Sequence, residues 1–258
     1  MNLLFLADVV GPAGRRAVEE NLPKLRERYD ADLAIVNGEN IADGVGITPK
    51  LADKLLAAGT DVVTLGNHTY RRGGIGGYLA ASERVIRPAN QGALTPGNAM
   101  AVVEARNGVR VAVLNLLGQL FLDTPVSPWE MVDALVDEAR AAAPVVFLDF
   151  HGEATSEKVA MAAWLDGRVT AVVGTHTHVQ TSDARVLPGG TAAITDAGMT
   201  GPHDSVIGVK SDLAISRMRE RLPVRFEPAE GGVRLEGVVV TCNDDGKARG
   251  IEAIRVDA

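Results

Sequence analysis

The sequence predicts an α/β fold in which neighbouring strands pair in parallel. Short apolar runs rich in Val, Ile and Leu recur along the chain, and segments with helical spacing separate several of them. Such runs are typical of strands buried on both faces, and their alternation with helices is typical of a parallel sheet. The runs are Leu3–Leu6, Leu33–Val36, Val62–Leu65, Val111–Leu116, Val145–Leu148 and Val169–Val173.

The helices between these runs are predicted from their start signals. Thr48 followed by Pro49, and Ser127 followed by Pro128, each precede apolar residues at helical spacing. A hydroxyl residue at the cap and a proline at the first helical position are typical of helix starts. In the first helical segment we predict that Pro23 begins a new turn, because a proline inside a helix removes a hydrogen bond and clashes.

Turn signals indicate antiparallel pairs beside the parallel strands, so we expect mixed sheets, two of them facing each other. Ile251–Val256 is expected to pair beside the last of these hairpins. The hairpins join Val102–Ala105 to Val109–Val113 through Asn107-Gly108, Val186 to Ala192–Ile194 through Gly189-Gly190, and Val224–Phe226 to Val233–Val240 through Gly231-Gly232.

Length and composition predict one domain over residues 1–258, with 46% hydrophobic and 23% charged residues. Residues 69–98 are rich in glycine and turn residues around a short helix near Tyr78–Ser82, and we interpret them as a small cap excursion. Met1–Val10 has no basic start and is interrupted by Asp8, which argues against a signal peptide, and no apolar run reaches a membrane-spanning length. With a single cysteine, Cys242, we expect a cytoplasmic protein without disulfides.

The formal net charge of −7 argues against binding of long nucleic acid, which needs many Lys and Arg side chains. A small anionic substrate remains compatible with this charge. Any metal site must use His, carboxylate and amide ligands, because one cysteine cannot form a thiolate cluster.

Unusual polar residues gather where the predicted strands end, and open α/β sheets form their ligand crevice there. Four of the five histidines belong to this set, together with Asp, Glu and Asn side chains. Five strand ends that carry such residues predict one shared site. The residues are Asp8 after the first run, Glu39 and Asn40 after the second, Asn67 and His68 after the third, His151 after Val145–Phe150, and His176 and His178 after Val169–Val173.

These side-chain types suit divalent transition metals. If the loop is extended, His176 and His178 face the same way and can reach neighbouring ions, whereas the adjacent Asn67 and His68 diverge, so that Asn67 ligates and His68 points to the substrate. Glu39 can span two ions with its two oxygens, and ions about 3.5 to 4 Å apart would clamp a displacement reaction. We therefore predict two metal ions. Asp43, Glu153, Thr181 and Asp196 are candidates to orient the histidines.

The order of these motifs resembles the calcineurin-like metallophosphoesterase superfamily, but Val10, Thr69 and the segment Asn37-Gly38-Glu39-Asn40 depart from its usual pattern. The departures resemble one subgroup, the YmdB-like bacterial phosphodiesterases, and the likeness extends over nearly the whole chain. It is carried by Asp8-Val9-Val10-Gly11, Asn37-Gly38-Glu39-Asn40, Ile41-Ala42-Asp43-Gly44, Gly66-Asn67-His68-Thr69, Arg87-Pro88-Ala89-Asn90, Asp149-Phe150-His151-Gly152-Glu153, Gly174-Thr175-His176-Thr177-His178-Val179-Gln180-Thr181 and Thr195-Asp196-Ala197-Gly198-Met199.

The resemblance implies a four-layer αββα sandwich, iron or manganese as the metal, self-association into a homo-oligomer, and phosphodiesterase activity on cyclic nucleotides such as 2′,3′-cyclic AMP. It also implies ligand roles for the predicted residues. One metal would be held by Asp8, Glu39, Asn40 and His178, and the second by Glu39 as a bridge together with Asn67, His151 and His176. His68 would be the proton donor.

The leading hypothesis is a binuclear phosphodiesterase in which a metal-bound hydroxide attacks phosphorus and His68 protonates the leaving oxygen. The same metals could serve a phosphomonoesterase such as a nucleotidase. A non-catalytic scaffold on this fold is a further alternative, and His68 beside a full ligand set argues against it. The sequence leaves open the physiological substrate, the metal, and the group that orients His68 where Thr69 replaces the usual acid.

Overall fold

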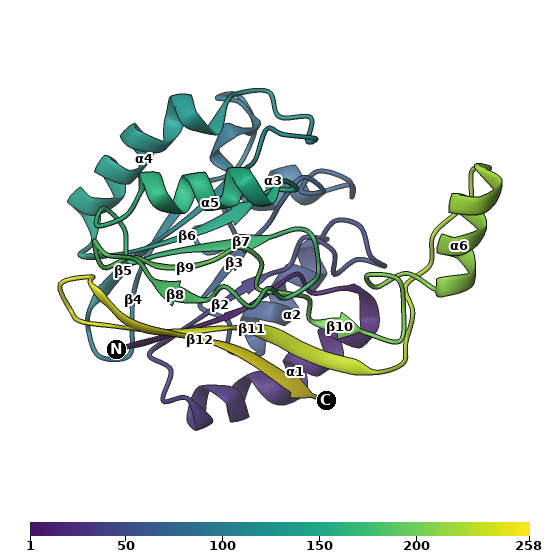
Figure 1. Cartoon of the computed structure of the whole chain (residues 1–258), viewed down its shortest axis with the longest axis horizontal. Helices are drawn as coiled ribbons and strands as arrows, with labels where there is room; N and C mark the ends of the chain where they lie inside the picture. Colours follow the sequence, from purple (N-terminus) through teal and green to yellow (C-terminus); the bar gives the residue numbers. More distant parts are fainter.

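The computed structural model describes residues 1–258 as two β-sheets packed face to face between outer helices (Figure 1). The predicted four-layer αββα sandwich is thereby confirmed. Outside the sheets lie six α-helices and one 3-10 turn: α1 (Gly11–Arg28), α2 (Pro49–Ala57), α3 (Ile75–Ala81), α4 (Pro128–Ala142), α5 (Thr155–Trp164), α6 (Ser211–Glu220) and η1 (Ala89–Gln91).

The first sheet contains the amino-terminal βα units and the carboxyl-terminal hairpin. β1, β2 and β3 pair in parallel, β11 joins β1 antiparallel, and β10 and β12 pair with β11. Its strands are β1 (Asn2–Leu6), β2 (Leu33–Asn37), β3 (Val62–Thr64), β10 (Gly201–Pro202), β11 (Val233–Cys242) and β12 (Ala248–Asp257).

The second sheet has a parallel centre with antiparallel edges. β5, β6, β7 and β9 run in parallel, whereas β4 and β8 close the predicted hairpins at the two edges. Its strands are β4 (Met100–Glu104), β5 (Arg110–Leu117), β6 (Val145–His151), β7 (Ala171–Thr175), β8 (Arg185–Val186) and β9 (Ala192–Ile194).

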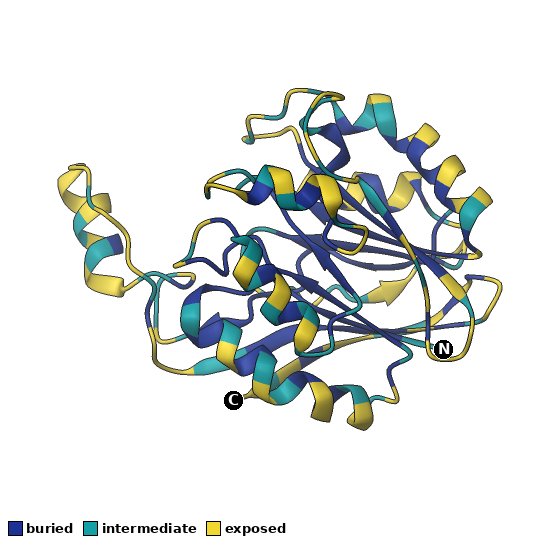
Figure 2. Cartoon of the chain, turned by 180° about the vertical axis from the view of Figure 1, so that it is seen from behind, coloured by how far each residue is buried: buried dark blue, intermediate teal, exposed yellow.

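Alternation along the strands divides the core into three layers. Figure 2 shows most strands buried and the outer helices buried on part of their surface only. Phe5 of β1 and Phe147 of β6 meet between the sheets, with ring centroids 5.3 Å apart. The neighbouring Leu4 faces α1 and α2 in the first outer core, and Leu148 faces α4 and α5 in the second. Because successive side chains of a strand point to opposite faces, continuous apolar runs serve both layers.

Two sequence predictions are wrong in detail. Helix α1 continues through Pro23 without a new start, and Val18, Leu22 and Leu25 keep one buried face on either side of the proline. Packing of this face against the first sheet outweighs the hydrogen bond that the proline removes. Val224–Phe226 does not form a strand: β11 pairs with β10 instead, and the Phe226 ring lies 5.1 Å from the guanidinium of Arg217 on α6.

None of the helices combines the length and the apolar character that a membrane crossing requires. The short helix predicted in the excursion is present as α3, and its Ile75 and Leu79 pack into the outer core of the first sheet. The excursion at 69–98 is thus anchored to the same core as β1 and β2.

Candidate metal centre

The two sheets bring the predicted residues to one edge of the sandwich. Because β1, β2 and β3 are parallel in one sheet and β6 and β7 are parallel in the other, their carboxyl ends lie at that edge. The loops after these strands, and His151 at the end of β6, place all eight predicted residues in one cluster that is linked by pairwise contacts: Asp8, Glu39, Asn40, Asn67, His68, His151, His176 and His178.

One group of donors surrounds Nε2 of His151. This atom lies 3.3 Å from Oε1 of Glu39, 3.0 Å from Oδ1 of Asn67 and 3.1 Å from Nδ1 of His176. Ligand atoms of Glu39, His151 and His176 all lie within 4.8 Å of one another. Imidazole nitrogens and oxygens at such spacing could share a single cation.

A second group adjoins Glu39 through Asn40, whose Nδ2 donates at 2.8 Å to Oε1 of Glu39, the oxygen that also faces His151. Nε2 of His178 is 3.2 Å from Nδ2 of Asn40 and 4.0 Å from Oδ1 of Asp8. Oδ1 of Asp8 is buried without any hydrogen-bond partner. A buried carboxylate oxygen without a partner is costly, so this atom fits a position that faces a cation.

The three histidines of these groups share one arrangement. Each has one ring nitrogen in the cluster and the other held by a group outside it. The outer partners are the Oγ1 atom of Thr175 for His151 at 2.9 Å, the carboxylate of Glu153 for His176 at 3.0 Å, and the carbonyl of Ile207 for His178 at 2.9 Å. Metal-binding histidines are usually oriented in this way.

Asp149 links the site to both sheets and was not singled out as a separate site residue by the sequence. Its carboxylate accepts hydrogen bonds from Asn37 of β2 at 2.8 Å, Thr64 of β3 at 2.5 Å and Thr175 of β7 at 2.6 Å. Thr175 in turn contacts Nδ1 of His151. The only signal for this role was an acid within the apolar run 145–150, where an unpaired charge would be unfavourable.

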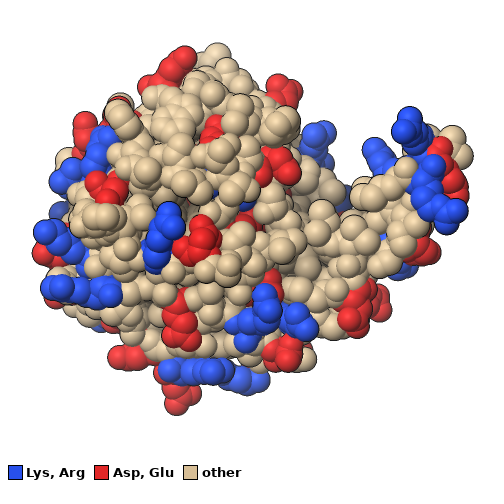
Figure 3. Space-filling view, in the orientation of Figure 1, with Lys and Arg blue, Asp and Glu red and all other residues tan.

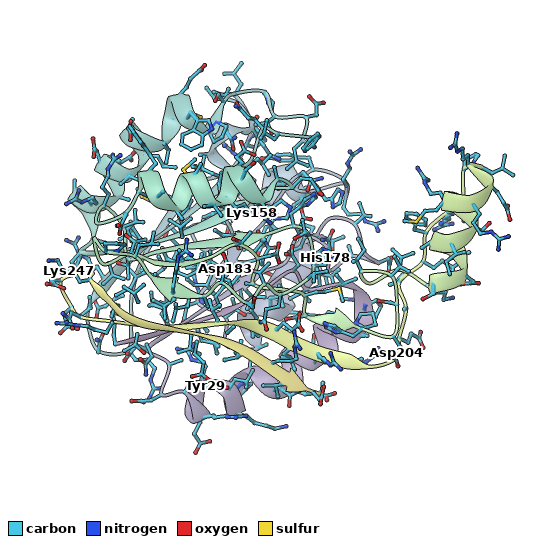
Figure 4. All side chains as sticks on the ribbon, in the orientation of Figure 1. Tyr29, Lys158, His178, Asp183, Asp204 and Lys247 are labelled. Carbon is cyan, nitrogen blue, oxygen red and sulfur yellow. The ribbon has the colours of Figure 1, made fainter.

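Lys158 of α5 is a further residue that the sequence did not reveal. Its ammonium group is buried, lies 2.9 Å from Oδ2 of Asp196 and donates to the carbonyl of Thr175 at 3.2 Å. The same oxygen of Asp196 accepts the backbone N–H and the hydroxyl of Thr177, between the two loop histidines. Lys158 and Asp196 therefore fix the loop that ends in His178. Figure 4 labels Lys158, on α5, and His178.

The loop 176–178 is not extended, so the predicted basis for the direction of its histidines is wrong. His176 has φ of 102° and His178 has φ of 62°, and Asp8 also has a positive φ of 28°. Residues other than glycine rarely adopt this region, and such strain is concentrated at functional sites. The hydrogen bonds of Thr177 to Asp196 hold the loop in this form.

Gly66 permits the close approach of Glu39 and His151 to the loop after β3. A Cβ atom at this position would overlap the carboxylate of Glu39 and would lie 2.5 Å from Nε2 of His151. Any larger residue would displace both side chains, so glycine is required here by space rather than by conformation.

His68 lies beside the cluster and makes three contacts with it. Its backbone N–H donates to Oε2 of Glu39 at 3.1 Å, and its Nδ1 atom lies 2.9 Å from Oδ1 of Asn40 and 3.3 Å from Oε1 of Glu39. Thr69 is buried and closes the turn through a 2.6 Å hydrogen bond to the carbonyl of Gly66. The groups beside Nδ1 of His68 are therefore Oδ1 of Asn40 and Oε1 of Glu39.

Burial and neighbouring charges shift the pKa values of the cluster. Burial raises the pKa of Asp8 from 3.8 to about 7. Burial opposes the charged form of His151, but the carboxylates of Glu39 and Asp8 prevail and raise its pKa to about 9. Burial and the neighbouring His151 lower the pKa of His176 to about 3. A cation in this cluster would keep the carboxylates ionised and the imidazoles neutral.

A pocket of about 420 Å³ opens onto this cluster. Glu39, Asn40, His68, His176 and His178 line its polar side. An apolar side is formed by the loop after β2 and by the segment on either side of α6, with Val45, Ile207, Val209, Phe226 and Pro228. The fifth histidine, His203, lies elsewhere, with Nε2 3.4 Å from Glu236.

Comparisons with known proteins show similarity over nearly the whole chain. The chain is 47% identical over 247 residues to the 2′,3′-cyclic-nucleotide 2′-phosphodiesterase of Bacillus subtilis, covering 96% of this chain and 93% of that protein. A solved hypothetical protein of Thermus thermophilus superposes with a TM-score of 0.93 at 39% identity, covering 100% of this chain and 99% of that one. A solved phosphatase of Mycoplasma pneumoniae gives a TM-score of 0.90 at 35% identity, covering 100% and 93%.

The family model described as YmdB-like protein matches residues 4–254 of the chain. This match and the relative at 47% identity confirm the resemblance that the motifs indicated. The protein therefore belongs to the YmdB-like family.

Proposed function

We propose that this protein is a binuclear metal-dependent phosphodiesterase that hydrolyses 2′,3′-cyclic nucleotides. The observation that supports it best is the arrangement of His151, His176 and His178, each with one nitrogen held from outside and the other directed into a cluster of carboxylates and amides. The activity named for the Bacillus subtilis relative supports the choice of substrate.

Two metal ions would be held by the two donor groups, with Glu39 between them. One group comprises Asp8, Asn40 and His178, and the other comprises Asn67, His151 and His176. The mixture of nitrogen and oxygen suits divalent transition metals, and the family resemblance supports iron or manganese among them. When bound, such ions would lower the pKa of water from 15.7 towards ~7 and so provide a nucleophile near neutral pH.

His68 would protonate the leaving oxygen. The contact of its Nδ1 atom with Asn40 leaves Nε2 for proton transfer, and the side chain lines the pocket. Its backbone contact with Glu39 ties the ring position to the cluster. A positioned acid of this kind typically contributes about 10² to 10⁴-fold to the rate.

The apolar side of the pocket fits the nucleoside part of a small phosphodiester. Val45, Ile207 and Phe226 border the polar cluster, so phosphate bound at the histidines would leave a base close to the Phe226 ring. Stacking of a base on an aromatic ring contributes about 1–3 kcal/mol. The pocket size suits a single nucleotide rather than a duplex.

The chain would act as one domain, with the 69–98 excursion supporting the pocket. Residues of both sheets share the central core. Arg72 from the excursion donates to the carbonyl of Val45 at 2.8 Å and also binds the carbonyl of Ala42, which stabilises the loop that carries Asp43. A cytoplasmic location would suit the buried free thiol of Cys242.

A phosphomonoesterase activity is the second candidate, since the Mycoplasma pneumoniae relative is named a phosphatase. The test is to load the protein with Mn²⁺ or, anaerobically, Fe²⁺ and to compare kcat/KM on 2′,3′-cyclic AMP with that on adenosine monophosphates. Bis-p-nitrophenyl phosphate and p-nitrophenyl phosphate form a matched diester and monoester pair without a nucleobase, so they show the preference of the metal site alone. We expect the diesters to be preferred in both pairs. A preference for the monoester in both pairs would contradict the phosphodiesterase proposal and assign a phosphomonoesterase activity.

A further inference from the structure

A further cavity, of about 250 Å³, lies at the end of the second sheet that is away from the metal centre. Its walls come from the loops that precede β6 and β7 and from the turns of the β8–β9 and β11–β12 hairpins. The metal centre lies at the other ends of β6 and β7, and its pocket shares no residue with this cavity. Figure 4 labels Lys247 of the cavity at the left edge of the molecule, away from His178.

The charged side chains that line this cavity are mostly basic, although the whole chain has a formal net charge of −7. Arg140, Arg168 and Lys247 lie against one acid, Asp245. Arg168 is paired with Asp133 at 2.5 Å, whereas Arg140 and Lys247 form no ion pair. Figure 3 shows Lys and Arg side chains, with acidic ones between them, along the edge where Figure 4 labels Lys247. Two cations can therefore pair with a ligand.

Two hydrogen-bond donors in the wall of the cavity have no acceptor within the chain. The backbone N–H of Val169, a buried residue, makes no hydrogen bond. The hydroxyl of Thr170 accepts the N–H of Val146 at 3.0 Å but donates its own proton to no group. Buried donors normally have an acceptor, so this wall suits a ligand rich in acceptor oxygens.

Contacts between the loops fix the shape of the cavity. Gly246 has φ of 87°, and a Cβ atom there would overlap the loop before β6. The carboxylate of Asp166 accepts the N–H of Gly189 at 2.8 Å, which holds the β8–β9 turn against the loop before β7. The carbonyl of Gly190 accepts the N–H of Ala248 at 2.9 Å and joins the two hairpins. A site that is formed in advance reduces the entropic cost of binding.

From these observations we infer that the cavity binds a small phosphate-bearing anion. Arg140 and Lys247 pair with the charge of the phosphate, while the N–H of Val169 and the hydroxyl of Thr170 donate to its oxygens. Hydrogen bonds from charged donors to phosphate are stronger than those between neutral groups. Pockets for organic ligands usually measure about 300–1,000 Å³. The smaller cavity here fits a phosphate with at most a small organic group.

The test follows the amide resonance of Val169 by NMR while inorganic phosphate is added to the full chain at constant ionic strength. This signal reports on the cavity itself, so phosphate that binds at the proposed metal centre does not interfere. We expect a saturable shift. Arg140→Met and Lys247→Met should each weaken the binding about tenfold, because each removes a charged donor. Lys24→Met is the matched control, since Lys24 is exposed on α1 and outside the cavity.

Glycerol 3-phosphate and citrate identify the class of ligand. Tighter binding of glycerol 3-phosphate than of inorganic phosphate would support a phosphomonoester as the ligand, and equal binding would support free phosphate. Tighter binding of citrate than of either phosphate would contradict a phosphate site.

Three further outcomes would overturn the inference. The first is the absence of a saturable shift at Val169 in the wild type. The second is unchanged affinity in both Arg140→Met and Lys247→Met. The third is an equal loss in Lys24→Met, which would show a general attraction of the anion to the protein surface. The remaining amide resonances of each variant show whether it is folded.

Discussion

The ammonium group of Lys158 lies 2.9 Å from the carboxylate of Asp196, and both side chains are buried behind the loop that carries His176 and His178. Because the same carboxylate oxygen binds Thr177, this ion pair maintains the positive φ angles of the two histidines. The pair acts on the metal centre without contacting it.

Lys158→Met should weaken metal binding by about 10 to 100-fold, the usual effect of losing a group that orients a ligand. The variant also leaves Asp196 as an unpaired buried charge, so its stability should fall. Metal affinity is measured by chelator competition at a temperature where the variant is folded. Lys158→Arg should recover part of the affinity, and unchanged affinity in Lys158→Met would remove the positioning role.

Gly66→Ala should abolish metal binding while the sheets remain folded. The added Cβ would overlap the carboxylate of Glu39 and the ring of His151, both of which are confined by buried neighbours. Gly73→Ala is the control, since a Cβ there meets nothing. Metal content after dialysis and the circular dichroism spectrum give the two readouts. Full metal content in Gly66→Ala would show that the cluster can rearrange.

The metal-free protein should lose stability as the pH rises from about 7 to about 9. The carboxylates of Glu39 and Asp8 raise the folded-state pKa of His151 from 6.5 to about 9. The stabilisation is therefore complete below pH ~6.5 and disappears as His151 loses its proton. Urea unfolding at several pH values measures this trend.

His151→Gln should remove the pH dependence of the metal-free protein in that interval. Metal-loaded protein should show the opposite trend in affinity, with tighter binding at higher pH, because the metal requires a neutral imidazole. A flat free energy of unfolding between pH ~7 and ~9 in the wild type would contradict the raised pKa.

Much of the site follows from the sequence because parallel strands end at one edge of a sheet, so Asp8, Glu39 and Asn67 had to be neighbours. The outer partners were not predictable, since Lys158 lies on a helix and Ile207 contributes only a backbone carbonyl. The prediction of a helix start at Pro23 was wrong because the hydrogen bond that proline removes can be read from the sequence. The tertiary packing that stabilises α1 despite this loss cannot. The sequence around α6 contains no pattern that predicts its projection from the body of the molecule (Figure 1).

His68→Ala should retain both metals and lose most activity on 2′,3′-cyclic AMP, by about 10² to 10⁴-fold. The loss on bis-p-nitrophenyl phosphate should be clearly smaller, because p-nitrophenolate departs without a proton whereas a sugar alkoxide needs one. Metal content and both rates are measured on the same preparation. Loss of metal would make His68 a ligand, and equal losses on both substrates would indicate that it positions phosphate.

The central claim is that two metal ions bind between the sheets with Glu39 shared between them. Metal analysis after reconstitution with excess Mn²⁺ tests it most directly, with Glu39→Gln as the variant, since a neutral amide cannot offer two anionic oxygens. We predict two ions per chain in the wild type and impaired binding at both sites in Glu39→Gln. One ion or fewer in the wild type, or two ions with near-normal turnover in Glu39→Gln, would contradict the bridged centre.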